Sequence, residues 1–150
     1  MNKSVLKKLT VENLISRIYH LTNLSKQKEL INYPISPRQL CVLHVMNTLG
    51  SKATSSEVGK IVERDVHVIT RIAIDLENEG LITRIKIEPK LNMLSYALTE
   101  KGRNMLKVSP ETKAITKVLL TLSKEEQVLL ESILNRILDS LKKDLYTEDS

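Results

Sequence analysis

Four side chains that could recognise the edge of a base pair recur at helical spacing between residues 67 and 74. They are His67, Thr70, Arg71 and Ile74. Successive residues of an α-helix lie about 100° apart, so these four share one face. Histidine, threonine and arginine can form hydrogen bonds with base edges, and isoleucine can contact a thymine methyl group. The spacing predicts an outward helical face whose side chains are candidates for reading the major groove of double-stranded DNA.

A simpler interpretation remains open for each of these side chains. Arg71 could pair with Asp75 one turn later on the same helix. His67 would lie in the first turn of the helix, where an exposed histidine is often only solvated. Ile74 could cover the lobe rather than touch a base.

A second set of side chains could contact phosphate groups. The set combines cations with hydroxyls: Arg38, Ser55, Ser56, Arg84, Lys86 and Lys90. Such contacts fix the register of a protein on DNA and supply its salt-dependent affinity. Two alternatives stay open, because lysines on an edge strand also prevent aggregation and the serines fall within a helix cap.

The residues that could hold a metal ion are few. Cys41 and His44 lie three residues apart, and His20 could join them from an earlier helix. Three scattered histidines without a carboxylate cluster do not define a metal site, and a lone cysteine among apolar residues is typically a small buried hydrophobe. We therefore expect no metal and no cofactor.

Caps and apolar spacing predict the helices that position these side chains. One amphipathic helix runs from Leu6 to about Leu30, and a second from Pro37, after the cap Ser36, to about Leu49. A capping box at residues 54–57 opens a short helix to about Val62. Asp65 caps the next helix, which carries the predicted base-reading face and ends near Glu79.

A hairpin follows this pair of helices. Residues 81–87 and 94–98 are rich in β-branched or apolar residues and read as two strands joined by a loop. Thr99 caps a helix to about Val108, and helical patterning resumes from about Glu111 to Thr121. A second capping box at residues 123–126 opens the last helix.

Apolar stripes on the first and last helices predict a dimer interface. The stripes consist of Leu6, Leu9, Leu14, Ile18, Leu130, Ile133, Leu134, Ile137, Leu138 and Leu141. One small lobe could not easily bury both stripes by itself. An intramolecular helical core remains the alternative.

Composition limits the classes of function. The chain has 150 residues, four tyrosines, no tryptophan and no phenylalanine, which argues against aromatic stacking platforms for single-stranded nucleic acid. Its net charge of +5 suits a polyanion, although residues 108–150 hold six basic against eight acidic residues. With no membrane-length apolar run, no secretory signal and one cysteine, we expect a cytoplasmic protein without disulfides.

Several stretches in order resemble the MarR family of winged-helix regulators, over nearly the whole chain and most closely from Ile35 to Leu106. They are residues 36–40 with Val42-Leu43, residues 56–58, Thr70-Arg71 with Leu76-Glu77, residues 80–82 with Arg84, residues 98–102, and residues 122–126. The resemblance implies a homodimer with interlocked terminal helices, two winged lobes on a palindromic site, and often a small ligand that alters their separation. The wing departs from the pattern, since residues 88–92 lack the usual aspartate and arginine.

We therefore predict a mainly α fold with a small β-hairpin, a winged helix-turn-helix lobe flanked by N- and C-terminal dimerisation helices. The expected segments are 1–34, 35–108 and 109–150, within one compact domain. The predicted function is sequence-specific binding of double-stranded DNA by a homodimeric repressor, with a small-molecule effector as a further partner. A winged-helix module for protein interaction is the alternative. With four glycines and neither a phosphate-cradling loop nor a nucleophile elbow, we expect no enzyme.

Overall fold

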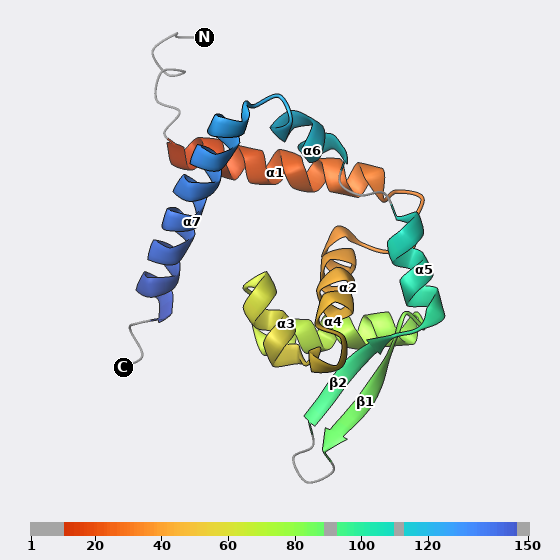
Figure 1. Ribbon diagram of the computed structural model, residues 1–150. Helices are drawn as coiled ribbons and strands as arrows, with labels where there is room; N and C mark the ends of the chain where they lie inside the picture. Colours follow the sequence, from red (N-terminus) through yellow and green to blue (C-terminus); the bar gives the residue numbers. More distant parts are fainter. Residues whose placement is uncertain (1–10, 89–92, 110–112, 147–150) are drawn as a thin grey trace. The chain divides into compact units, whose positions relative to one another are not determined.

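The computed structural model describes residues 11–88, 93–109 and 113–146 (Figure 1). Within these ranges the chain is mainly α-helical with one two-stranded hairpin, which confirms the predicted fold class. The elements are α1 (Val11–Glu29), α2 (Pro37–Leu49), the 3-10 helix η2 (Gly50–Lys52), α3 (Ser55–Val62), α4 (Val66–Asn78), β1 (Ile82–Glu88), β2 (Met93–Leu98), α5 (Glu100–Val108), α6 (Lys113–Leu119) and α7 (Lys124–Tyr146).

The chain divides into two compact units by its internal contacts, Met1–Glu111 and Thr112–Ser150. The first unit holds the elements from α1 to α5, including the hairpin, and the second holds α6 and α7. No helix of the described residues is long and apolar enough to cross a membrane.

Helix α2 begins and ends where its caps predict. The Ser36 hydroxyl accepts a hydrogen bond from the Gln39 amide at 3.2 Å, and the Gln39 side chain accepts one from the Ser36 amide at 2.9 Å. Pro37 stands at the first helical position, where a missing N–H leaves nothing unsatisfied. This reciprocal cap fixes the entry of a helix that buries Leu43 and Met46 completely.

The capping box predicted for α3 is only half formed. The Thr54 hydroxyl accepts from the Glu57 amide at 3.2 Å, as expected. The Glu57 carboxylate instead pairs with Lys60 at 2.7 Å, and the Thr54 amide donates to the Lys52 carbonyl. Because the Lys52 carbonyl of η2 already accepts from the Thr54 amide, this amide is not left to donate to the Glu57 carboxylate, as a complete capping box would require.

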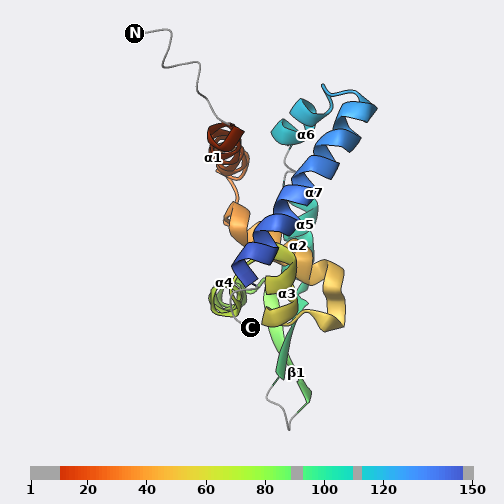
Figure 2. The ribbon, with the colours of Figure 1, turned by 90° about the vertical axis from the view of Figure 1, so that its left-hand side faces the viewer.

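A tight turn joins α3 to α4 (Figure 2). Glu63 adopts a left-handed conformation with φ 52°, and the Arg64 amide donates to the Gly59 carbonyl at 3.0 Å. A Cβ on Gly59 would lie 2.7 Å from the Arg64 carbonyl oxygen, so only glycine fits this close approach. The Asp65 carboxylate then accepts from the His67 amide at 2.7 Å and caps α4.

The hairpin is tied to the helical lobe at both strands. Strands β1 and β2 are antiparallel, with Ile82 opposite Leu98 and Arg84 opposite Tyr96. The Tyr96 amide donates to the Ala53 carbonyl at 2.7 Å, which anchors β2 beside η2. The core that positions α4 and the hairpin includes Leu43, Met46, Val58, Ile69, Leu76, Leu81 and Ile82.

Neither α1 nor α7 contains a buried residue, although both carry apolar stripes. In the predicted stripes, Leu14, Ile18, Ile133, Leu134, Ile137, Leu138 and Leu141 are exposed and Leu130 is half-buried. Leu6 and Leu9 lie outside the described residues. The apolar area on both helices is free to meet another surface.

Candidate nucleic-acid interface

Helix α4 presents the predicted recognition face to solvent. Its opposite side buries Ile69, Ile72, Ala73 and Leu76. His67 and Arg71 are exposed, Ile74 is 42% exposed, and Thr70 is half-buried. The α4 amphipathicity therefore places three of the four candidates outward and leaves Thr70 at the edge of the lobe.

The Arg71 guanidinium is available for an external partner. It forms no ion pair with Asp75 or with any other described residue, so the intrahelical alternative is absent here. An unpaired arginine on the exposed side of a helix can bind the two acceptors of guanine in the major groove. Its exposed position and its lack of an ion pair with a described residue make Arg71 the strongest base-reading candidate of the four.

Three hydroxyls connect α3, α4 and the hairpin in one chain of hydrogen bonds. The Thr70 hydroxyl donates to the Val66 carbonyl at 2.9 Å. The Ser55 hydroxyl oxygen lies 2.9 Å from that of Thr70 and 2.5 Å from that of Tyr96. Each hydroxyl has one proton, and that of Thr70 is committed to the carbonyl. Ser55 therefore donates to Thr70, and Tyr96 donates to Ser55.

This direction of donation restricts the hydrogen bonds that Ser55 and Thr70 can form with DNA. A phosphate oxygen only accepts, so Ser55 could donate to phosphate only by giving up its bond with Thr70. Thr70 can only accept from a base, as from the amino group of adenine or cytosine. Ser56 is exposed and forms no side-chain hydrogen bond with a described residue, which makes it the freer of the two serines.

Replacing Tyr96 with phenylalanine tests the hydroxyl chain. Tyr96 is 4% exposed, so Tyr96→Phe removes a buried donor and keeps the ring. We expect a loss of about 1 kcal/mol in the free energy of unfolding, measured by urea denaturation. Tyr146→Phe is the matched control, because Tyr146 is 68% exposed. Equal stability of the two variants would contradict the hydrogen bond between Tyr96 and Ser55.

The basic candidates of the hairpin differ in whether an acidic side chain already binds them. Arg84 forms an ion pair with Glu77 of α4, and this carboxylate raises the pKa of the Arg84 guanidinium by hydrogen bonding and charge. Lys86 is exposed without a described partner. Lys90 lies outside the described residues. To contact a DNA phosphate, Arg84 would have to share its guanidinium group between the phosphate and Glu77 or break its ion pair with Glu77.

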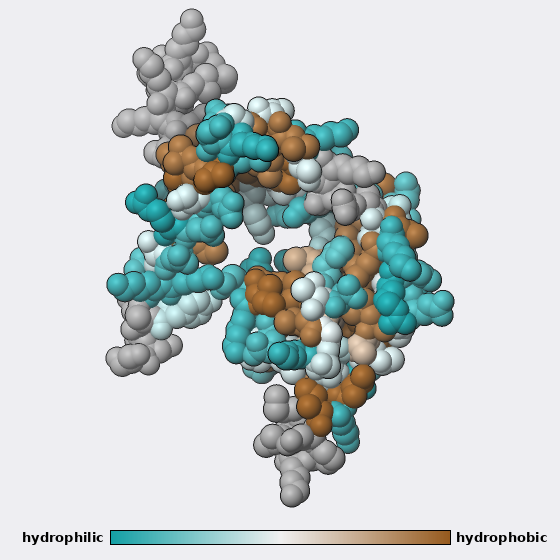
Figure 3. Space-filling view, viewed as in Figure 1, coloured by the Kyte–Doolittle hydropathy of each residue, from teal (hydrophilic) through white to brown (hydrophobic). Residues whose placement is uncertain are grey.

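Two basic residues of α5 form hydrogen bonds within the fold. The Lys101 ammonium donates to the Glu79 carbonyl at 2.6 Å, and the Arg103 guanidinium donates to the Leu98 carbonyl at 2.8 Å. The Lys101 side chain thus binds a carbonyl group at the C-terminal end of α4, and the Arg103 side chain binds the last carbonyl group of β2. Ile85 and Ile87 alternate with the β1 cations and are about half exposed, at the end of the hairpin where apolar surface is visible in Figure 3.

The remaining phosphate candidate lies outside the recognition face of α4. Arg38 is exposed at the start of α2, beside a pocket that Cys41 also lines. Cys41 is exposed, so the expectation of a buried hydrophobe was wrong: its position on α2 faces outward between the buried Leu40 and Val42. No group of three or more histidine, cysteine or acidic residues among the described residues could hold a metal ion.

Two cations of this region were missed from sequence. Arg64 lies in the turn between α3 and α4, and Lys26 lies on α1, yet both line the pocket that holds Arg38. Nothing in their spacing indicates this, because the three come from separate elements. Only the close approach of α1 to the lobe brings them together.

Comparison with solved structures identifies the fold. A MarR family protein from Bacillus stearothermophilus has 25% identity and a TM-score of 0.66, with 95% of this chain and 99% of that chain covered. MepR of S. aureus, solved with DNA, has 20% identity and a TM-score of 0.79 over 89% and 98% of the two chains. The organohalide-sensing transcriptional regulator RdhR-CbdbA1625, solved with 2,4-dichlorophenol, has 21% identity and a TM-score of 0.78 over 95% and 87%.

No protein-family model and no curated protein matches the sequence. The structural likeness shows that the chain has the winged-helix fold of MarR-family regulators, as its motifs predicted. These neighbours are transcriptional regulators rather than enzymes.

Proposed function

We propose that this chain, whose fold is that of the MarR-family regulators, is a homodimeric transcriptional repressor that binds a palindromic DNA operator and responds to a small ligand. The observation that carries the proposal is the exposed, unpaired Arg71 beside His67 on the second helix of a capped helix-turn-helix. DNA bound to MepR and 2,4-dichlorophenol bound to RdhR support the two kinds of partner.

Each element has a role in this proposal. Helix α4 enters the major groove, where Arg71 binds guanine and Thr70 accepts from an amino group. Ser56, Lys86 and Lys90 contact phosphates and set the register. The C-terminal helix α7 joins two copies so that their α4 helices reach successive half-sites.

Selection of bound sequences from a pool of random duplexes tests the function directly. We expect a palindrome whose half-sites are about one helical turn apart, which is about 34–36 Å. Binding without a recovered motif would leave a nonspecific DNA-binding protein. No binding even at low salt would overturn the proposal in favour of a protein-interaction module.

Replacing Arg71 with alanine should weaken operator binding without changing assembly. Loss of one bidentate contact in each half-site is expected to reduce affinity at least about tenfold, measured by fluorescence anisotropy. Arg17→Ala on α1 is the matched control, since Arg17 is exposed and lies outside the proposed interface. Unchanged affinity and sequence preference would remove Arg71 from the reading face.

Charges placed in the α7 stripe should separate the dimer. Leu134 is 48% exposed and Leu138 is 41% exposed within one chain, so both are available to a partner. We expect the native protein to sediment as a dimer at micromolar concentration and the double variant Leu134→Glu with Leu138→Glu as a monomer. Ser132→Glu, off the stripe, should remain dimeric. A monomeric native protein would contradict this interface.

A further inference from the structure

A pocket of about 470 Å³ lies against the face of the hairpin that carries Ile85. Its walls come from the C-terminal end of α2, η2, both strands and α5 (Figure 1). We call it the hairpin pocket, and its lining includes Asn47, Ser51, Ile85, Ile87, Ser95 and Arg103. Pockets of this volume are typical of sites for small molecules.

The buried polar group of the hairpin pocket is Ser95. This residue is 4% exposed, and its hydroxyl forms no hydrogen bond with a described residue. Ser95 pairs with Ile85 across the two strands, and cross-strand partners project from the same face of a sheet. Since Ile85 also lines the pocket, the Ser95 side chain lies on the pocket side. A buried donor without an acceptor is costly, and a ligand atom that accepts its proton would remove this cost.

Much of the remaining wall is apolar. Ile85 is 50% exposed and Ile87 is 46% exposed, although both are large apolar side chains. Met46, Ala97 and Leu98 also line the pocket. A ligand that covers the two isoleucines would remove apolar surface from water, which stabilises its binding. The lining therefore favours an occupant with an apolar body.

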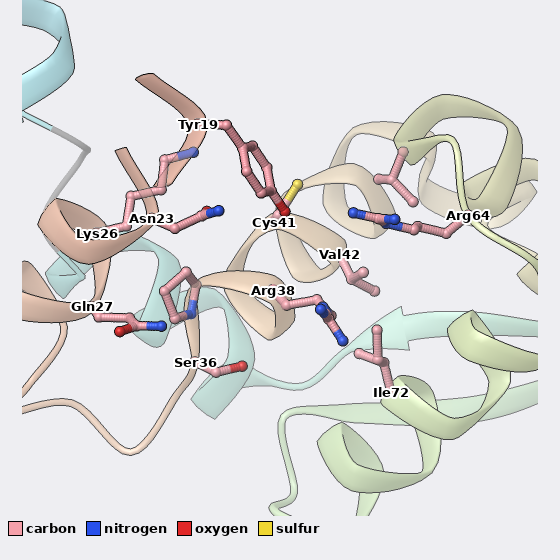
Figure 4. A pocket seen from close by; sticks show the side chains of 12 residues that line it. Tyr19, Asn23, Lys26, Gln27, Ser36, Arg38, Cys41, Val42, Arg64 and Ile72 are labelled. Carbon is pink, nitrogen blue, oxygen red and sulfur yellow. The ribbon is translucent and has the colours of Figure 1, made fainter. Parts of the chain in front are cut away.

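The hairpin pocket carries little charge. Lys26, Arg38 and Arg64 line the pocket of Figure 4, whereas Arg103 is the one charged side chain among the described residues that line the hairpin pocket. Arg103 is exposed, and its guanidinium already donates to the Leu98 carbonyl at 2.8 Å. A charged group that enters among apolar side chains loses water, and one exposed guanidinium compensates for little of that loss. The occupant is therefore uncharged.

We propose that the hairpin pocket binds an uncharged, mainly apolar small molecule whose carbonyl oxygen accepts a hydrogen bond from Ser95. Its apolar body lies against Ile85 and Ile87. The occupant contacts the hairpin and the end of α2 at once, next to the point where the Tyr96 amide holds β2 to the Ala53 carbonyl. The assignment goes beyond the proposed function and does not rest on it, because the lining lies within one lobe and binding requires no DNA.

Two probes of nearly equal shape test the hydrogen bond. Benzophenone has a carbonyl group between two phenyl rings, and diphenylmethane has a methylene group in its place. Both are sparingly soluble, so the full-length, DNA-free protein is titrated from the syringe into each probe by calorimetry. We expect saturable binding of benzophenone, with diphenylmethane about fivefold weaker because it leaves the Ser95 hydroxyl without an acceptor.

A third probe tests the preference for an uncharged ligand. 4-Benzoylbenzoate keeps the benzophenone skeleton and adds a carboxylate. We expect it to bind at least about threefold weaker than benzophenone, because the carboxylate must give up water on entering the pocket.

Variants place the carbonyl group beside Ser95. In Ser95→Ala the affinities of benzophenone and diphenylmethane should come within about twofold of each other, because only benzophenone has a hydrogen bond to lose. Ile85→Thr keeps a β-branched side chain and should weaken both probes at least about threefold. Ser132→Ala, on α7 and outside the lining, should leave both affinities unchanged. Circular dichroism confirms that each variant is folded.

Irradiation of bound benzophenone locates the site independently. Excited benzophenone forms bonds to neighbouring C–H groups, so peptide mass spectrometry is expected to find the label on residues 46–51, 85–87 or 95–98. The proposal would be overturned by label on α1 or α7 instead, by equal affinity of benzophenone and diphenylmethane for the native protein, or by unchanged discrimination in Ser95→Ala. Binding of 4-benzoylbenzoate as tight as that of benzophenone, or absence of saturable binding, would overturn it as well. These experiments contain no DNA, so their failure and a failure of the duplex selection are distinguishable.

Discussion

Raising the salt concentration from 50 to 200 mM is expected to weaken binding to the recovered duplex about 10²- to 10⁴-fold. Each phosphate that a cation neutralises releases counterions, and this release becomes less favourable as salt rises. If about two to four candidate cations of each protomer reach phosphate, a dimer makes about four to eight contacts. Anisotropy titrations at five salt concentrations measure the slope. A loss smaller than tenfold would contradict a phosphate-contacting interface.

Two variants of β1 identify which cations produce that slope. Lys86 is exposed without a described partner, so Lys86→Gln should reduce the slope of the dimer by about 2. Arg84 already pairs with Glu77, so Arg84→Gln should change the slope less. The two residues face the same side of one strand, and each serves as the control for the other. A larger effect from Arg84 would show that its ion pair opens on DNA.

The parts of this fold that local chemistry determines were predictable from sequence. Ser36, Pro37 and Gln39 start α2 through contacts within four residues, and the helix runs from Pro37 to Leu49 as predicted. Asp65 and Thr99 likewise cap α4 and α5. A cap needs only neighbours along the chain, so its sequence pattern is nearly sufficient.

The candidate site was less predictable because its decisive contacts join distant residues. Thr54 to Glu57 has the pattern of a capping box, but the carbonyl of Lys52 takes the donor that would close it. Nothing near Ser55 in the sequence indicates that its hydroxyl forms a hydrogen bond with Tyr96, 41 residues later. These pairings depend on how β2 packs beside α3, which periodicity does not specify.

A single added methyl group at Gly102 is expected to lower the free energy of unfolding by about 3 kcal/mol. Gly102 is buried in the first turn of α5, and a Cβ there would collide with the Leu81 carbonyl oxygen and carbon. That oxygen also accepts from the Thr99 amide at 3.0 Å, while the Thr99 hydroxyl accepts from the Gly102 amide at 3.0 Å. The carbonyl therefore cannot move away without disturbing the cap of α5.

Whether Gly102→Ala destabilises or stabilises the protein shows which is larger, the steric clash of the added methyl group or the gain in helix propensity. Alanine is intrinsically better than glycine inside a helix by about 1 kcal/mol, so an uncrowded site would make Gly102→Ala stabilising. Asn104→Ala, at an exposed position on the same helix, should stay within about 0.5 kcal/mol of the native protein. Urea denaturation at one fixed protein concentration compares the variants, since unfolding of a dimer depends on concentration. A stabilised Gly102→Ala would mean that α5 does not pack its backbone against Leu81, and the hairpin would then lose the support that holds it beside α4.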